Sequence, residues 1–302
     1  MKIKFTEKIK RTPLNEFERD IRQENGLIEG GWLRRGQFAL VTSTTGAGKS
    51  VLCTQMAISW TLGAACCGLR PIRPLKVWVI QSEDDEDRVA RDRDDISASL
   101  FRNVGDYKMW GCWEAVQFVD FNGKMGLEFL ATLDRELGVD GPDVVLISPL
   151  NAYFGGNLKE GSDATLFLKG GKRGDKEYKG FERILKERGC AAVLFCHTGK
   201  PPSTSEQKAW LNDSFSAYKF CGASEFVDAA RSALTFLPCR NAKGKFIFDA
   251  CKNGSGLGWT DGKGEVTTKS IWSWGDGGKH YWAEVAKSEW EGIFAAEMKR
   301  MI

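Results

Sequence analysis

The sequence has no long apolar run, and that absence excludes several classes of protein. No stretch approaches the roughly eighteen uninterrupted apolar residues that a membrane-spanning helix needs. Residues 1–11 are basic but lack the apolar segment of a secretory signal. No internal repeat of fixed period occurs either. We therefore expect no signal peptide, no membrane span and a cytoplasmic protein.

A strong charge of either sign is also missing. The 302 residues include 43 Lys and Arg against 40 Asp and Glu, which gives a net charge of +3. That balance is too mild to indicate a nucleic-acid partner by itself, because such binding depends on local clusters of charge. Paired cysteine spacings are absent too: none of the nine cysteines forms a C-x-x-C pair, and most lie in apolar runs. We expect buried, reduced thiols.

What the sequence does contain is a candidate phosphate-binding loop at residues 41–50, between an apolar run and a helical pattern. Gly46 and Gly48 allow a tight turn with inward N–H groups, Lys49 can reach outer phosphates, and the Ser50 hydroxyl can ligate Mg²⁺. Ser43 replaces the first glycine of the G-x-x-x-x-G-K-[ST] pattern. A simple tight turn is the alternative, but the flanking strand and helix favour a site for a nucleoside triphosphate. The expected nucleotide-binding residues are Thr44, Thr45, Gly46, Ala47, Gly48, Lys49, Ser50 and Val51.

Strand and helix patterns alternate along the chain. Strands are expected at 38–42, 76–81, 115–121, 143–147 and 191–196, and helices at 49–63, 86–101, 127–137 and 181–188. Strands at 233–237 and 246–250 form an antiparallel pair, before a β-like stretch at 267–274 and a helix at 286–298. The pattern predicts an α/β fold with a mostly parallel central sheet, helices on both faces and an antiparallel C-terminal extension. We expect an arm at 1–25, a core at 26–257 and a tryptophan-rich extension at 258–302 that packs on the core.

Three features fall at the carboxyl ends of expected parallel strands, where ligands collect in such sheets. They are the phosphate-binding loop, Glu83 after the second strand and His197 after the fifth. A carboxylate can orient and deprotonate an attacking water, and an imidazole can sense a phosphate. The alternatives are that Glu83 belongs to an acidic helix start and that His197 is structural.

Further motifs occur in a characteristic order: Gly36-Gln37 before the loop, and the segments 79–84, 144–150, 154–157, 195–198, 222–224, 228–231 and 250–253. With these motifs, residues 26–257 resemble the RepA-like branch of the RecA-fold ATPases, which includes hexameric replicative helicases of plasmids. The resemblance implies a RecA-like three-layer fold and an ATP-hydrolysing ring motor that acts on DNA, with ATP and Mg²⁺ as cofactors. It also implies a homo-hexamer, single-stranded DNA as substrate, and a replication initiator or primase as partner.

Catalytic roles follow from the same resemblance. Glu83 would be the catalytic carboxylate beside Lys49, His197 the phosphate sensor, and Arg231 an arginine finger inserted into the neighbouring subunit's site. Lys252 would be a second cation acting on the nucleotide in trans. As alternatives, Arg231 is an edge residue or ion-pair partner, and Lys252 is an ordinary surface lysine.

Ser148 is the main departure from the family pattern, which has a Mg²⁺-holding aspartate there. Serine can hydrogen-bond a metal-bound water but adds no charge. We therefore expect Ser50 and Ser148 as metal residues, with weak Mg²⁺ binding or compensation by Glu83, Asp84 or Asp143. The alternative function is a slow or inactive nucleotide-gated assembly or binding module, and a more remote one is an ATPase that acts on proteins.

Two expected loops, 154–162 and 198–221, could line a pore and contact single-stranded DNA. Solvated lysine faces are the alternative. The C-terminal tryptophans alternate as strand residues do, which favours a packed layer or a subunit contact over a base-stacking platform. The residues considered for DNA contact are Lys169, Lys172, Arg173, Lys176, Lys179, Lys200, Lys208, Trp210, Phe215, Tyr218, Lys219 and Phe220.

Overall fold

The computed structural model describes residues 25–121, 123–138, 140–173, 176–199, 222–239, 242–275 and 278–298. A nine-stranded sheet lies at its centre, in the order β13-β12-β11-β10-β3-β9-β6-β4-β5. From β5 to β10 all neighbours are parallel, and β11, β12 and β13 are antiparallel. The strands are β3 (Phe38–Ser43), β4 (Val77–Gln81), β5 (Val116–Phe118), β6 (Val144–Ser148), β9 (Ala191–His197), β10 (Ser232–Pro238), β11 (Lys245–Lys252), β12 (Lys269–Trp274) and β13 (Trp282–Glu284). The expected mostly parallel sheet with an antiparallel extension is confirmed.

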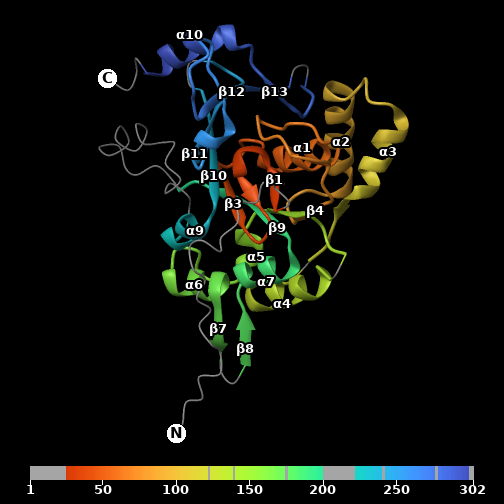
Figure 1. Cartoon of the computed structure of the whole chain (residues 1–302), viewed down its shortest axis with the longest axis vertical. Helices are drawn as coiled ribbons and strands as arrows, with labels where there is room; N and C mark the ends of the chain where they lie inside the picture. Colours follow the sequence, from red (N-terminus) through yellow and green to blue (C-terminus); the bar gives the residue numbers. More distant parts are fainter. Residues whose placement is uncertain are drawn as a thin grey trace, which may run out of the picture.

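Helices cover both faces of this sheet (Figure 1). On one face pack α1 (Lys49–Thr61), α2 (Glu86–Leu100) and α3 (Asp106–Ala115). On the other pack α4 (Gly126–Glu136), α5 (Asn151–Phe154), α6 (Gly161–Lys169), α7 (Phe181–Arg188) and α9 (Ser224–Ala229). Successive residues of β3 alternate between the two cores: Ala39 and Val41 join the first, and Phe38 and Leu40 the second. A strand covered on both faces is mostly apolar, which is why residues 38–41 of β3 show no polar alternation.

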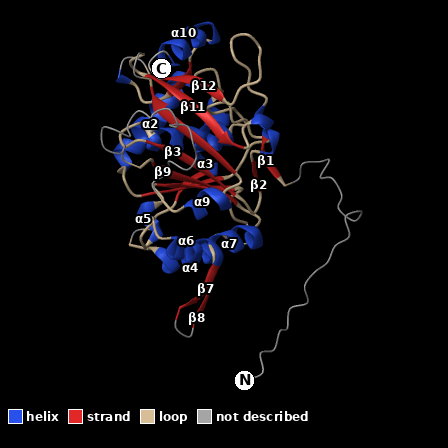
Figure 2. Ribbon diagram, turned by 90° about the vertical axis from the view of Figure 1, so that its left-hand side faces the viewer, coloured by secondary structure: helices blue, strands red, loops and turns tan. Residues whose placement is uncertain are grey.

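Several short elements were not predicted. β1 (Gly26–Ile28) pairs with β2 (Leu33–Arg34) ahead of the sheet. The Gly- and Lys-rich segment 151–180 holds α5, α6 and a ribbon of β7 (Gly170–Arg173) with β8 (Lys176–Lys179). This ribbon projects from the helical layer in both views (Figure 2). It pairs with no strand of the central sheet, so its residues lack the apolar pattern by which the other strands were recognised.

The C-terminal tryptophans form packed layers, as the alternation indicated. Trp272 and Trp282 join the core on the α1 face, because β12 and β13 extend the central sheet itself. Trp290 on α10 (Lys287–Met298) packs with Ile271 and Val285. The expected boundary between residues 257 and 258 stays a prediction.

Asp143 is a charged anchor at the amino end of β6, and it is almost fully buried. It pairs with Arg35 and Arg73, the latter at 2.8 Å, and accepts the Lys76 N–H at 2.9 Å. Burial opposes its ionisation, but the hydrogen bonds from Arg73 and Lys76 and the two arginine charges outweigh that effect and lower the pKa of Asp143.

Replacing Asp143 by asparagine is expected to reduce the free energy of unfolding by about 1–3 kcal/mol at pH 7, between the values for exposed and buried pairs. Since the folded pKa of Asp143 is lowered, its carboxylate stabilises the fold above about pH 4, and this contribution is lost as the pH falls through the folded value. The free energy of unfolding of the variant should therefore fall less between pH 7 and pH 3.5 than that of the natural chain. Urea denaturation at pH 7 and pH 3.5 measures both effects. Glu136→Gln, which removes an exposed pair with Arg135, is the control, and equal stability of the two variants would contradict the prediction.

Candidate nucleotide-binding site

The loop between β3 and α1 forms an anion-binding helix start. Gly46 and Gly48 have φ of 75° and 83°, the left-handed region that favours glycine. α1 begins at Lys49, and no side chain caps it. The first N–H groups of an α-helix have no partner within the helix, and they attract a nearby negative charge. The loop can therefore receive phosphate oxygens.

Gly48 is held from behind by the C-terminal strands. A Cβ atom at Gly48 would lie 2.4 Å from the ring of Trp274, so no other residue fits without displacing that ring. The Trp282 indole N–H donates to the Gly48 carbonyl at 3.4 Å. The Gln55 side chain on α1 exchanges two hydrogen bonds with the backbone of Trp282, at 2.7 and 2.8 Å. The loop and the first turns of α1 are thus fixed by residues more than 200 positions away.

Lys49 lies folded back on its own loop. Its Nζ donates to the carbonyls of Thr44 at 2.7 Å and Ser43 at 3.3 Å, and the residue is buried. Burial lowers the pKa of Lys49 to about 8, and the negative charge of Glu83 partly opposes this. A cation held only by neutral carbonyls gains a better partner when a phosphate enters the loop.

Ser43 does not obstruct the loop. Its Oγ donates to the Phe236 carbonyl on β10 at 2.6 Å, so the side chain is directed into the sheet. The departure from glycine at this position is accommodated by a hydrogen bond between neighbouring strands.

A cavity of about 500 Å³ opens beside the loop, a size that suits a small-molecule ligand. Glu83 and His197 line it together with Lys49, so the structure brings together the three features expected at the strand ends. His197 Nδ1 lies 3.2 Å from Thr45 Oγ1. Burial and then the charge of Lys49 lower the pKa of His197, which keeps the imidazole neutral at pH 7. The further lining residues are Gly46, Ala47, Gly48, Ser50, Val51, Arg88, Pro238, Gly244, Phe246 and Trp274.

Ser148 and two of its three possible substitutes, Asp84 and Asp143, are not among the described residues that line this cavity. Ser148 ends β6, is 3% exposed and is not among the described residues that line the cavity. Asp143 lies at the opposite end of β6 and is paired with arginines, so the idea that it supplies the missing carboxylate is wrong. Asp84 lines a separate cavity. Of the three candidates for compensation, only Glu83 faces the loop.

Arg231 and Lys252 lie at the amino ends of the parallel strands, opposite the end that carries the phosphate loop. β10 runs parallel to β3, with Ser232 opposite Ala39, so Arg231 precedes the strand while the phosphate loop follows β3. The Lys252 Nζ donates to the carbonyls of Val227 at 2.6 Å and Asp228 at 3.2 Å. One chain therefore does not bring Arg231 or Lys252 to its own nucleotide cavity, and their action in trans stays a prediction.

The basic residues considered for DNA contact are partly paired. Lys169 bonds Glu182 at 2.6 Å, and Lys179 bonds Glu187 at 2.6 Å and Asp134 at 3.0 Å. These pairs favour the solvated-face interpretation for those two lysines. The side chains of Arg173 and Lys176 lie outside the described residues, as do Lys200, Lys208, Trp210, Phe215, Tyr218, Lys219 and Phe220.

Five lining residues were missed by the sequence analysis: Arg88, Pro238, Gly244, Phe246 and Trp274. Arg88 stands in an acidic run that reads as an exposed helix face, and Phe246 and Trp274 read as ordinary strand residues. The signal that could have singled out Trp274 is its place at the end of an expected strand. Whether this strand lies near the phosphate loop depends on the order of strands in the sheet, and the sequence alone does not give that order.

The mostly parallel sheet and the loop after β3 define a RecA-like P-loop ATPase. A model of the AAA domain family matches residues 4–203, more than half of the chain, and the chain belongs to that family. The fold is similar to the crystal structure of the RadB recombinase, with a TM-score of 0.50 and 9% identity over 83% of this chain and 92% of that one.

A KaiC-like protein from the hyperthermophilic archaeon Pyrococcus horikoshii OT3 gives a TM-score of 0.46 and 17% identity over 82% of this chain and 90% of that one.

No curated protein matches the sequence. No helix within the described ranges is both long and apolar enough to cross a membrane.

Proposed function

We propose that this chain binds ATP with Mg²⁺ in the cavity before α1 and hydrolyses it. One observation carries the proposal: the uncapped start of α1, Lys49, Glu83 and His197 all line one cavity. Two of these groups attract phosphate, and the other two are suited to handle a proton and to sense a phosphate.

The residues divide the work as follows. The N–H groups at the start of α1 and the Lys49 ammonium would bind the phosphates, and the Ser50 hydroxyl would bind Mg²⁺. Mg²⁺ would neutralise charge on the phosphate oxygens. The Glu83 carboxylate orients the attacking water and accepts its proton, while His197 responds to the phosphate through Thr45. Among the described residues no three Asp, Glu, His or Cys side chains form a metal site, and Ser50 and Glu83 are the side chains at the cavity that would contribute to Mg²⁺ binding.

We further propose that the chain acts as an oligomeric motor on DNA, of the RepA-like type, as a hexamer with an initiator or primase partner. The motifs of the sequence support this, as does the placement of Arg231 on the sheet edge away from the loop, where it is available to a neighbouring copy. Phosphate release measured with and without single-stranded DNA, and particle size measured with ATP, test the proposal. A monomer at every protein concentration, or no effect of DNA on turnover, would rule out the motor. A steep fall of DNA binding with added salt would favour DNA over a protein substrate.

Ser148 favours the second candidate, a module that binds ATP but hydrolyses it slowly. Replacing Ser148 by aspartate is expected to lower the Mg²⁺ concentration for half-maximal ATP binding by about tenfold, because a carboxylate adds the charge that a serine lacks. Ser148→Asn, similar in shape but uncharged, should leave it unchanged. A large gain in turnover over a near-background natural chain would establish the slow module, whereas robust Lys49-dependent turnover in the natural chain would favour the motor. Equal Mg²⁺ dependence of the two variants would contradict the prediction.

A further inference from the structure

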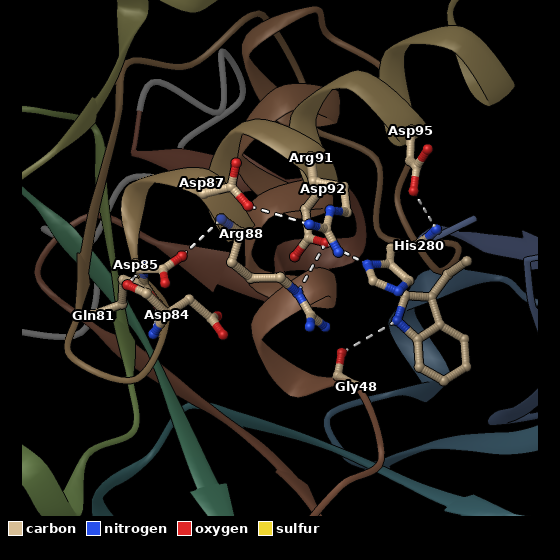
Figure 3. A network of polar contacts seen from close by, with 11 residues as sticks. Gly48, Gln81, Asp84, Asp85, Asp87, Arg88, Arg91, Asp92, Asp95 and His280 are labelled. Atoms are coloured by element: carbon tan, nitrogen blue, oxygen red, sulfur yellow. Dashed lines mark hydrogen bonds and ion pairs between the residues drawn. The ribbon is translucent and has the colours of Figure 1, made fainter. Parts of the chain in front are cut away.

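Arg88 reaches the nucleotide cavity from the helix that follows Glu83. α2 is capped by Asp85, whose Oδ1 accepts the Arg88 N–H at 2.8 Å. From the first turns of α2 the Arg88 side chain extends toward the phosphate loop, with its guanidinium between Asp92 and Gly48 (Figure 3). It lines the cavity together with Lys49 and Glu83. A cation of α2 thus faces the place where the phosphates would lie.

A buried carboxylate stands behind this guanidinium. Asp92, one turn further along α2, is 1% exposed, and its Oδ1 lies 3.3 Å from Arg88 Nε. The same oxygen lies 2.8 Å from the ring nitrogen Nδ1 of His280. The backbone N–H of His280 donates to Asp95 Oδ2 at 2.8 Å. Burial raises the pKa of Asp92, and the hydrogen bond with His280 and the charges of Arg88 and His280 oppose that rise. A buried carboxylate destabilises the fold unless it is paired. Asp92 therefore holds the side chains of Arg88 and His280 in place.

The neighbouring arginines of α2 are arranged differently. Arg91 pairs with Asp87 at 3.2 Å, where both side chains are exposed, and Arg93 pairs with the adjacent Asp94. Arg88 Nε forms an ion pair with Asp92 at 3.3 Å but no hydrogen bond, and no hydrogen-bond acceptor for the two terminal nitrogens of Arg88 is found among the described residues. An arginine anchored at one end, with its fork directed into an anion-binding cavity, is arranged for phosphate.

We propose that Arg88 is a further phosphate-binding residue of the chain's own nucleotide site, positioned by Asp92 and His280. This inference rests on the proposed binding of ATP. It gives the C-terminal segment a part in that site, because His280 lies between β12 and β13 with its ring centroid 5.8 Å from that of Trp274. The same segment holds Gly48 from behind.

The test compares Arg88→Ala with Arg91→Ala, an arginine on the same helix that does not line the cavity. We expect Arg88→Ala to weaken ATP binding by roughly ten- to a hundredfold, the usual range for losing a charge-assisted hydrogen bond. Arg91→Ala should stay within about twofold of the natural chain, and Arg88→Lys should recover part of the affinity. Titration with ATP and with ADP measures these values.

The positioning role is tested by Asp92→Asn and His280→Gln. Each should weaken ATP binding less than Arg88→Ala does, and neither should weaken it further in an Arg88→Ala background, because each acts through Arg88. His280→Gln keeps the test valid if Asp92→Asn fails to fold. If the natural chain binds ATP but Arg88→Ala and Arg91→Ala bind it with equal affinity, the role of Arg88 is wrong while the proposed function stands. No binding of ATP by the natural chain would overturn the proposed function and this inference with it.

Discussion

Replacing Lys49 by alanine is expected to weaken ATP binding by roughly a hundredfold or more and to reduce ATP turnover to background. The reason is that the Lys49 ammonium is the cation closest to the loop and is held there only by the carbonyls of Ser43 and Thr44. Loss of a desolvated charge facing a phosphate costs about 2–5 kcal/mol. Calorimetric titration with ATP measures the affinity, and phosphate release measures the turnover.

The pH dependence of the natural chain gives a second check on Lys49. Burial lowers its pKa from 10.5 to about 8, so ATP affinity should begin to fall as the pH rises past about 8 and the ammonium loses its proton. Between pH 8 and 10.5 the unfolded chain binds more protons at this residue than the folded chain does. Its share of the free energy of unfolding of the nucleotide-free protein therefore rises with pH over that window. The alanine variant should be at least as stable as the natural chain at pH 7, because it removes a buried charge. An affinity for ATP equal to that of the natural chain would disprove the role of Lys49.

Much of the fold follows from local pattern. The apolar runs at 38–42, 143–147 and 191–196 became β3, β6 and β9, because strands buried on both faces must be apolar. The residues at the carboxyl ends of β3, β4 and β9 were predictable as neighbours for the same reason: parallel strands end at one edge of a sheet.

What the pattern could not supply was long-range placement. Nothing near Trp274 or Trp282 indicates that β12 and β13 would bring them against Gly48, since that depends on the strand order of the sheet. Arg88 was hidden for a related reason. Its helix reads as polar and exposed, and the buried acid that orients it is stabilised by a histidine 188 residues away.

The same placement changes the meaning of the C-terminal extension. By sequence it is a separate tryptophan-rich addition to the core. By structure its strands hold Gly48 from behind, bond Gln55 on α1 and hold Asp92 through His280. A change in these strands should therefore reach the nucleotide site through packing, although they are remote from it in sequence.

Replacing Trp282 by alanine is accordingly expected to lower the free energy of unfolding by about 3–5 kcal/mol, the usual cost of truncating a buried aromatic ring. The Trp282 ring is fully buried and lies 4.8 to 5.5 Å from the rings of Phe236, Phe246, Phe248 and Trp274. Urea denaturation measures this loss. Since Trp282 also supports Gly48, ATP affinity should fall about tenfold in the fraction that remains folded, because a small displacement of the loop misplaces the groups that bind the phosphates.

Trp290→Ala separates general destabilisation from an effect on the site. Trp290 is nearly as buried as Trp282 but packs with Ile271 and Val285, away from the loop. It should lose comparable stability and keep its affinity for ATP. Trp282→Phe keeps most of the packing but lacks the N–H that bonds Gly48, and its free energy of unfolding should fall by less than about 1.5 kcal/mol. Its affinity for ATP should stay within a few-fold of that of the natural chain, because the Gly48 carbonyl also accepts the Leu52 N–H at 3.0 Å. If Trp282→Ala and Trp290→Ala bind ATP equally well, the C-terminal strands stabilise the fold without shaping the loop.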